Sequence, residues 1–224
     1  ILRMIAGLLQ PTSGSITIEG RPCTEPGPDR GMVFQDFALL PWRSVVKNVE
    51  LGLEIAGVPK EERRQRAEKY LEVVGLEKFK DARINELSGG MKQRVGIARA
   101  LVNKPDVLLM DEPFGALDAQ TRNIMQAGLI KILQKTDQTI IFVTHSVDEA
   151  VYLSDRILAL KANPGEINEL IEVPLPRPRR SRMLLEPEFL ATREHIDKLI
   201  RPPVKREDEC EFKVVNMVGD KTFL

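Results

Sequence analysis

The sequence lacks the features that mark membrane-spanning, disulfide-stapled and nucleic-acid-coating proteins. No apolar run approaches the roughly 18 residues that span a bilayer. Only two cysteines occur, Cys23 and Cys210, and their spacing is neither metal-like nor redox-like, which is typical of a reducing compartment. The 33 lysines and arginines cancel the 33 aspartates and glutamates, so no net field favours a phosphate backbone, and we expect no nucleic-acid partner. What is present, 42% hydrophobic and 29% charged residues, is the composition of an ordinary globular chain.

A regular alternation of helix and strand patterns predicts the fold class. The 224 residues have room for one large domain, or for one domain with an appendage. The expected strands are 15–19, 31–34, 107–110, 139–143 and 157–160, and the expected helices are 45–76, 88–103, 121–135, a short one after Ser146, and 183–200. Strands that are apolar on both faces and separated by helices favour a parallel α/β sheet covered on both sides. Ligands bind such sheets at the carboxyl ends of the strands.

A segment rich in proline and arginine follows about residue 172. Its prolines and arginines are Pro174, Pro176, Arg177, Pro178, Arg179, Arg180 and Arg182. We interpret it as a solvated linker, and contact of the arginines with lipid headgroups is the alternative. Residues 201–224 carry no periodicity that predicts a structure or a function.

Two adjacent acids, Asp111 and Glu112, follow the apolar run 107–110. A carboxylate pair at the end of a buried strand is costly unless a cation or a proton-transfer task uses it. In nucleotide hydrolases the first acid of such a pair holds Mg²⁺ and the second orients or deprotonates the attacking water. An acidic strand end that merely caps the next turn is the structural alternative.

A serine and two glycines, Ser88, Gly89 and Gly90, stand at the start of the helix expected over 88–103. A serine N-cap, glycines that permit close approach and unpaired helix N–H groups together favour an anion site shaped for a terminal phosphate. A simple capped helix would explain Ser88. It would not explain the double glycine, which weakens a helix start.

Two further polar residues follow expected strands. Gln35 can bring an amide oxygen to Mg²⁺ or to its water, and His145 can hydrogen-bond a γ-phosphate. A lone strand-end glutamine is more often exposed polar surface. Ser146 and Glu149 form a capping box, which leaves the His145 imidazole free at the strand end.

In this order and spacing, the motifs resemble the ATP-binding subunits of ABC transporters. Leu87 to Arg94 is similar to the LSGGQ-type signature, with Met91 where glutamine is commonest, and residues 107–112 are similar to the Walker B strand with its catalytic glutamate. Residues 115–118 resemble the D-loop, Gln35 the Q-loop and His145 the switch histidine. The resemblance implies an ABC-type P-loop ATPase core with an α-helical signature subdomain, and ATP and Mg²⁺ as cofactors.

The resemblance also implies residue roles and partners. Two such subunits dimerise head to tail, so that Ser88, Gly89 and Gly90 contact the ATP of the second subunit. Asp111, Glu112, Gln35 and His145 serve the chain's own ATP, with Glu112, His145 and Gln35 catalytic, and Asp111 and Gln35 on the metal. Asp118 contributes to nucleotide binding from the dimer seam.

Softer segments resemble importers of the nitrate, sulfonate, taurine and bicarbonate group. They are residues 36–45, 111–122 and 164–167. This implies transmembrane permease subunits, an extracytoplasmic substrate-binding protein and a peripheral position on the cytoplasmic face of the membrane. Residues 36–48, with Trp42, would dock the permease, although Trp42 in an ordinary core is the alternative. We expect an ATPase domain over 1–172, its helical subdomain over 36–100, and a linker, helix and tail over 173–224.

One family motif does not occur in the 224 residues, the phosphate-binding G-x-x-x-x-G-K-[ST]. The family places its lysine and hydroxyl immediately before a helix that resembles residues 1–8, which read as the end of a buried helix. We therefore expect that the N-terminal part of the core is missing here and that the chain alone is inactive. A non-catalytic remnant that lends only its signature face to a partner is one alternative, and a non-transport ABC ATPase of DNA repair or translation is another.

Overall fold

The computed structural model describes residues 1–115, 117–133, 138–161 and 164–200. The expected helix at 121–135 ends in it at Leu133, and residues 134 and 135, like the tail 201–224, lie outside the described part. In chain order the helices and strands are α1 (Leu2–Ile5), β1 (Thr17–Ile18), β2 (Arg21–Pro22), β3 (Arg30–Val33), α2 (Val45–Val49), α3 (Leu51–Ile55), α4 (Lys60–Val73), η1 (Glu77–Phe79), η2 (Ile84–Glu86), α5 (Gly89–Leu101), β4 (Val107–Asp111), α6 (Ala119–Leu133), β5 (Thr139–Val143), α7 (Val147–Leu153), β6 (Arg156–Lys161), β7 (Glu166–Glu172), η3 (Ser181–Leu185) and α8 (Pro187–Ile200).

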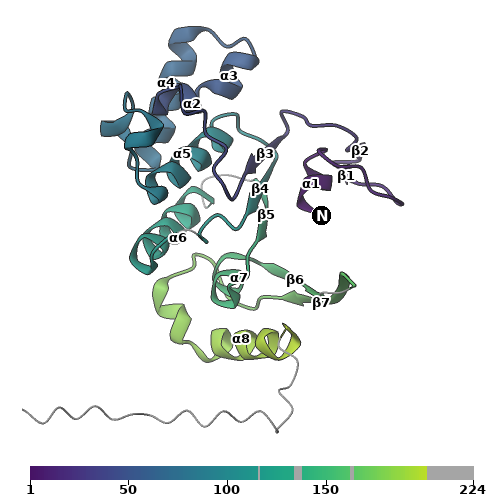
Figure 1. Cartoon of the computed structure of the whole chain (residues 1–224). Helices are drawn as coiled ribbons and strands as arrows, with labels where there is room; N and C mark the ends of the chain where they lie inside the picture. The colour runs from purple at the N-terminus through teal and green to yellow at the C-terminus, as the bar shows by residue number, and fades with distance from the viewer. Residues whose placement is uncertain (116, 134–137, 162–163, 201–224) are drawn as a thin grey trace, which may run out of the picture.

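A three-stranded parallel sheet lies at the centre, in the order β3-β4-β5 (Figure 1). Strand β4 is buried on both faces, and its side chains alternate between two cores, as a strand period of two requires. Leu108 and Met110 pack with α5 and α6, whereas Val107 and Leu109 pack against α1. The predicted parallel α/β sheet with helices on both faces is therefore confirmed for these strands.

The segment between β3 and β4 forms a helical part with its own apolar core. Helices α2, α4 and α5 contribute that core, whose buried members are Val45, Val46, Val49, Leu53, Ala67, Leu71, Val74, Leu76, Ile84, Leu87, Val95, Ala98 and Val102. The helix expected over 45–76 is three helices, because Gly57, with φ of +74°, and Pro59 end the helical path before α4. The predicted apolar stripe is present, since Ala67 and Leu71 of α4 are fully buried.

The first residues place a short helix against the sheet. Helix α1 buries Leu2, and Ala6 follows it into the same core, as expected for the end of a buried helix. The strand expected over 15–19 is shorter, and β1 pairs with β2 in an antiparallel hairpin. Figure 1 shows α1 and this hairpin on the side of the sheet opposite to α5.

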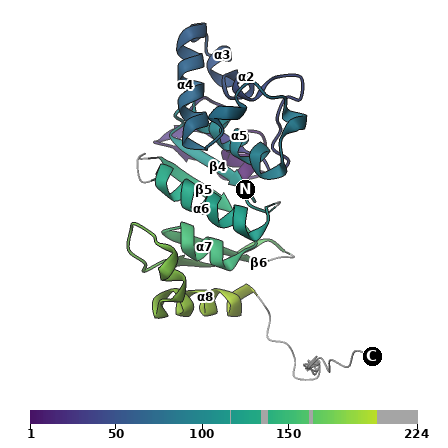
Figure 2. The same cartoon turned by 90° about the vertical axis from the view of Figure 1, so that its left-hand side faces the viewer.

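The prediction that 157–160 adds a parallel strand is wrong. Strand β6 pairs antiparallel with β7, which the sequence analysis did not identify, and among the described residues the pair forms a sheet of its own. The connection between the two strands is too short for a parallel crossover. Of the β6 side chains only Ala159 is buried, and it packs in the core that α8 also enters through Phe189 and Ile196. Figure 2 shows α6, α7 and α8 stacked along this end of the molecule.

The interpretation of the arginine-rich segment as solvated is also wrong for Arg179, whereas Arg177 is exposed but paired with the domain. Arg177 forms a bidentate ion pair with Asp155, with Nε–Oδ1 at 2.8 Å and Nη2–Oδ2 at 3.0 Å. Arg179 is buried, and it donates to the carbonyls of Val151 and Ser154, both at 3.1 Å. These arginines satisfy the unpaired carbonyls at the end of α7, which is the site that a helix C-terminus offers to cations. The segment is therefore fastened to the domain by these two residues, and Arg177, Arg180 and Arg182 are exposed.

The Arg177–Asp155 pair predicts a pH-dependent stability. The hydrogen bond from Arg177 holds the pKa of Asp155 below its ordinary 3.8. A lowered pKa contributes stability that is present above the unfolded-state value and is lost as the pH falls through the folded-state value. We expect Asp155→Asn to lower the free energy of unfolding by about 0.5–1 kcal/mol at pH 7, because the carboxylate is largely exposed, and by nothing measurable near pH 2. Urea unfolding at several pH values tests this, with the exposed Asp106→Asn as control, and a loss that stays constant with pH would contradict it.

Within the part of the chain that the structure describes, every helix is too short or too polar to cross a bilayer.

Candidate functional site at the carboxyl ends of three strands

The polar residues predicted for the strand ends meet at one edge of the sheet. Gln35 follows β3, Asp111 is the last residue of β4 and Glu112 comes directly after it, and His145 follows β5. Because β4 is hydrogen-bonded to both other strands and all three are parallel, these ends adjoin one another. The register Asp111↔Val143 brings the acids of β4 level with the last residue of β5.

One carboxylate oxygen joins three of these residues. Glu112 Oε2 accepts a hydrogen bond from Gln35 Nε2 at 3.4 Å and lies 3.2 Å from His145 Nδ1. The Glu112 side chain is 31% exposed and the His145 side chain is 71% exposed, so the group faces an open surface. A histidine whose Nδ1 donates to a carboxylate has its Nε2 available for another partner. The arrangement can therefore hold a water or an oxyanion beside Glu112.

The backbone at Glu112 is strained. Its φ of +43° lies in the left-handed region, which non-glycine residues adopt at a cost and which recurs at functional sites. Two hydrogen bonds fix this conformation. The Glu112 amide donates to the Val143 carbonyl of β5 at 2.9 Å, and the Gly115 amide donates to the Glu112 carbonyl at 3.1 Å. This turn separates the direction of Glu112 from that of Asp111.

Asp111 and Gln35 retain oxygens that could hold a cation. No described residue hydrogen-bonds or pairs with the Asp111 carboxylate, and the Gln35 amide oxygen is likewise not engaged within the described part. No group of three or more His, Cys, Asp or Glu in the described ranges could hold a metal ion by itself. Mg²⁺ in nucleotide sites takes one or two protein oxygens and completes its shell with phosphate and water, so this hard-oxygen pair fits it.

The capping-box prediction for Ser146 and Glu149 is only half right. Ser146 Oγ accepts from the Glu149 amide at 3.4 Å, as a cap should. The Ser146 amide donates instead to Thr144 Oγ1 at 3.0 Å, and Thr144 Oγ1 donates to Glu149 Oε2 at 2.7 Å. The Glu149 carboxylate therefore holds the residue before His145 rather than closing the box.

Glu149 also connects the His145 loop to α6, which sequence reasoning missed. Glu149 is buried, with 6% of its surface exposed. Gln126 Nε2 of α6 donates to its Oε1 at 3.2 Å. Arg122 Nε of α6 lies 3.7 Å from the same oxygen, and Arg122 Nη2 donates to the Leu117 carbonyl at 3.0 Å. The only sequence signal for this network was an acid whose capping role already seemed to explain it.

Asp118 caps α6. Its Oδ1 accepts the Thr121 amide at 2.9 Å, and this hydrogen bond lowers the pKa of the carboxyl. The cap accounts for the aspartate structurally, and its place at a dimer seam stays a prediction. Ala116, within the segment that resembles the D-loop, lies outside the described residues.

The start of α5 has the predicted serine cap, and packing explains one of its two glycines. Ser88 Oγ accepts the Met91 amide at 3.3 Å, and Ser88 and Gly89 are exposed. A Cβ on Gly89 would meet nothing, whereas one on Gly90 would lie 2.9 Å from Thr121 Cγ2 of α6. Gly90 is therefore required for α5 to pack on α6, and the expectation that the double glycine has no structural gain is wrong for it. Gly89 remains without a packing reason.

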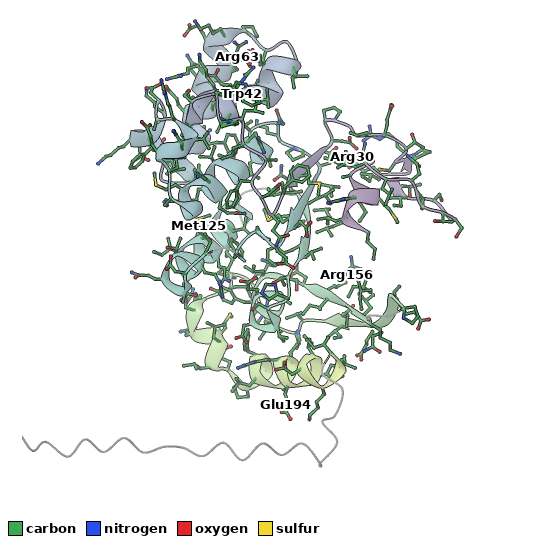
Figure 3. All side chains as sticks on the ribbon, in the orientation of Figure 1. Arg30, Trp42, Arg63, Met125, Arg156 and Glu194 are labelled. Atoms are coloured by element: carbon green, nitrogen blue, oxygen red, sulfur yellow. The ribbon has the colours of Figure 1, made fainter. Side chains whose placement is uncertain are left out.

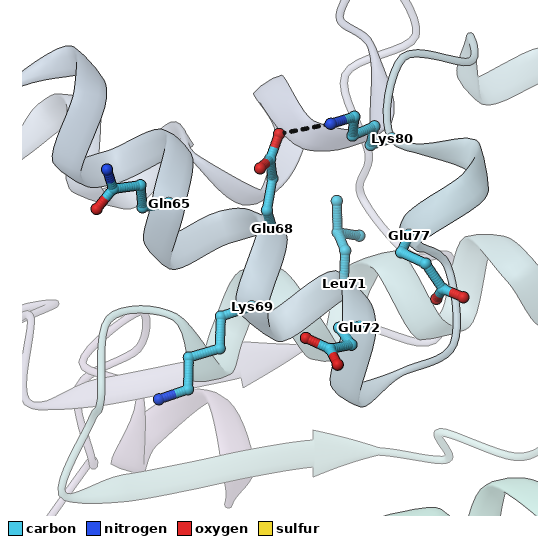
Figure 4. Close-up of a pocket in the computed structure, with 7 residues that line it drawn as sticks. All are labelled: Gln65, Glu68, Lys69, Leu71, Glu72, Glu77 and Lys80. Carbon is cyan, nitrogen blue, oxygen red and sulfur yellow. Dashed lines mark hydrogen bonds and ion pairs between the residues drawn. The ribbon is translucent and has the colours of Figure 1, made fainter.

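A cavity of about 470 Å³ lies away from these residues, on the helical part. Figure 4 shows it beside α4 and η1, where Glu68 pairs with Lys80. Its lining residues are Gln65, Glu68, Lys69, Leu71, Glu72, Glu77 and Lys80. None of the residues predicted to bind or hydrolyse a nucleotide is among them.

Comparisons with known proteins point to one family. A family model described as "ABC transporter" matches residues 1–115. An uncharacterised ABC transporter ATP-binding protein of Methanocaldococcus jannaschii is 54% identical over 91% of this chain and 75% of its own length. A nitrate import ATP-binding protein of Synechocystis sp. is 47% identical over 94% of this chain and 81% of its own length. A taurine import ATP-binding protein of Pseudomonas putida is 46% identical over 88% of this chain and 77% of its own length.

A solved structure gives the same answer for the fold. A dimeric ATP-binding cassette in a post-hydrolysis state, bound to ADP and Pi, superposes with a TM-score of 0.67. It is 35% identical and covers 77% of this chain and 78% of that chain.

Proposed function

Because the chain belongs to the ABC transporter family, we propose that it is the ATP-hydrolysing subunit that drives import of a small anion. The observation that carries the proposal is the meeting of Gln35 and His145 on one oxygen of Glu112, at the strand ends where such sheets bind ligands. The similarity to nitrate and taurine import proteins supports the substrate class, which also includes sulfonate and bicarbonate.

In this function each of the strand-end residues has its own chemical role. Glu112 orients the attacking water, and His145 contacts the terminal phosphate through Nε2. Asp111 and Gln35 would hold Mg²⁺, and the ion would supply positive charge that neutralises the phosphates. Assays of turnover use the protein expressed from its natural gene.

The remaining predicted residues serve a second subunit. Ser88 and Gly89 are exposed at the start of α5, where a helix N-terminus favours a phosphate, and with Gly90 they would contact the ATP of the partner. Asp118 would lie at the seam of that dimer. The assembly would include permease subunits and an extracytoplasmic substrate-binding protein, with this subunit on the cytoplasmic face. Residues 36–100 would act as the helical subdomain within an ATPase domain over 1–172, followed by the C-terminal segment 173–224.

Uptake in the source organism tests the function. Deletion of the gene is expected to abolish uptake of one labelled anion among nitrate, taurine, sulfonates and bicarbonate. The natural gene on a plasmid should restore it, whereas a copy carrying His145→Ala should not. Uptake of all four anions at the parental rate in the deletion strain would reject the proposed substrate class.

A further inference from the structure

The loop from Gln35 to Ser44 contains two consecutive strained residues. Phe37 and Ala38 have φ values of +63° and +43°, and neither is a glycine. Such residues are costly and persist only where the surrounding structure holds them. Groups outside the loop must therefore hold it in place.

Arg99 of α5 donates hydrogen bonds to the carbonyls of both strained residues. Its Nη2 donates to the Phe37 carbonyl at 2.8 Å and its Nη1 donates to the Ala38 carbonyl at 2.6 Å. The planar guanidinium suits two adjacent acceptors, which the single ammonium of a lysine cannot reproduce. One turn earlier, a Cβ on Gly96 would lie 3.8 Å from the Phe37 carbonyl oxygen, so the helix runs close to the loop. Partial burial of Arg99 lowers the pKa of its guanidinium.

Asn48 of α2 holds the other half of the loop. It is fully buried, and its Oδ1 accepts the Leu40 amide at 2.8 Å. Its Nδ2 lies 3.1 Å from the Leu40 carbonyl, 3.2 Å from that of Arg43 and 3.0 Å from that of Ser44. Helices α2 and α5 share one apolar core, so the two anchors pack together, and α5 also packs on the sheet through Ile97, Ala100 and Leu101.

Trp42 lies in the segment that Asn48 holds, after the residues that Arg99 contacts. It is 78% exposed, so its interpretation as a core residue is wrong, and Figure 3 shows it in the helical part formed with α2 to α4. Gln35, by contrast, reaches the sheet side through a 3.4 Å hydrogen bond to Glu112. The loop is thus bound to α5 and α2 from Phe37 onward, and it is bound to the strand ends through Gln35 and through the Phe37 amide, which donates to the Phe34 carbonyl at 3.1 Å.

We propose that Arg99 is a positioning residue that fixes the loop Phe37–Ser44 to α5, so that the loop carrying Trp42 keeps its place relative to the Ser88 helix start. The mechanical link concerns this chain alone. Its consequence for transport rests on the proposed function, in which Trp42 meets the permease and Ser88 meets the nucleotide of the partner.

The 224-residue chain tests the link directly, since Trp42 is its only tryptophan. Arg99→Lys keeps the charge and loses the fork, so hydrogen exchange of the segment 36–44 is expected to rise about tenfold, and the fast component of the Trp42 anisotropy decay to grow. Arg94→Lys is the matched control, because Arg94 lies on the same helix and donates instead to the Val74 carbonyl of α4. It should leave both readouts of the loop unchanged.

A second variant separates positioning from general destabilisation. Ala38→Gly removes the cost of the left-handed conformation, so in the Arg99→Lys background it should restore part of the protection of segment 36–44. Unchanged exchange in Arg99→Lys, or an equal rise in Arg94→Lys, would overturn the proposal.

The transport consequence is measured separately, with the natural gene product and its permease in liposomes. Arg99→Lys is expected to lower permease-stimulated ATP turnover about fivefold, with basal turnover changed less than about twofold. If Arg99→Lys frees the loop but permease-stimulated ATP turnover stays normal, the proposed consequence for transport is overturned. The mechanical link between Arg99 and the loop then still stands. A natural gene product that hydrolyses no ATP would reject the proposed function and leave the fluorescence and exchange results as they are.

Discussion

Replacing Glu112 with glutamine is expected to reduce ATP turnover of the natural gene product at least about 100-fold, while ATP still binds. Glutamine keeps the size of the side chain and an oxygen for Gln35, whose Nε2 lies 3.4 Å from the present carboxylate. It removes the charge that orients a water and pairs with His145 at 3.2 Å. The loss should therefore appear in kcat and not in the affinity for ATP, which equilibrium binding of a fluorescent ATP analogue measures in parallel.

The control for this prediction is a glutamate that lies away from the predicted nucleotide site. Glu77 lines the cavity beside α4 and is not among the predicted nucleotide-site residues, so Glu77→Gln should change kcat less than about twofold. Turnover of Glu112→Gln within about threefold of the parent would reject the catalytic role of Glu112.

The second large effect is expected on stability, from Arg179→Met. The Arg179 side chain is 1% exposed, and its two donors satisfy the Val151 and Ser154 carbonyls at the end of α7. Methionine keeps an apolar stem and removes both donors, so buried acceptors lose their partners. We expect the free energy of unfolding of the 224-residue chain to fall by about 2–4 kcal/mol, measured by urea denaturation.

Arg182 offers the matched control within the same arginine-rich segment. It is exposed, and Arg182→Met should change the free energy of unfolding by less than about 0.5 kcal/mol. Equal effects of the two substitutions would mean that the buried guanidinium contributes no more than a solvated one, which would contradict the assigned role of Arg179.

The sequence predicted the strand ends because apolar runs and polar stops are local signals. Residues 107–112 show both, and the structure places the run on β4 with Glu112 at its end. Parallel pairing then brings Gln35 and His145 to the same edge, although each lies far from Glu112 along the chain. The pattern indicates which residues end strands, but the contact of both with one oxygen depends on the left-handed turn at Glu112.

Other features could not be predicted because their signals are shared with simpler structures. An apolar run such as 157–160 fits a parallel strand or an antiparallel one, and only the partner strand β7 decides between them. Arg179 looks like any arginine of a linker until α7 presents its carbonyls to it. Glu149 looks like a capping residue until the fold places Gln126 of α6 beside its carboxylate.

Two of the three apolar cores of the described residues differ in a way that bears on how the chain folds. The core of the helical part draws its buried residues from Val45 to Val102, a continuous stretch, whereas the core beside the sheet draws them from Val33 to Ile196. Contacts between residues close in sequence form early, and β3 can pair with β4 only after the whole intervening segment has been brought together. The helical part is thus built to collapse first, and its completion shortens the search that closes the parallel sheet. The rate-limiting step of folding would then lie in the pairing of β3 with β4, the same pairing that brings Gln35 to Glu112.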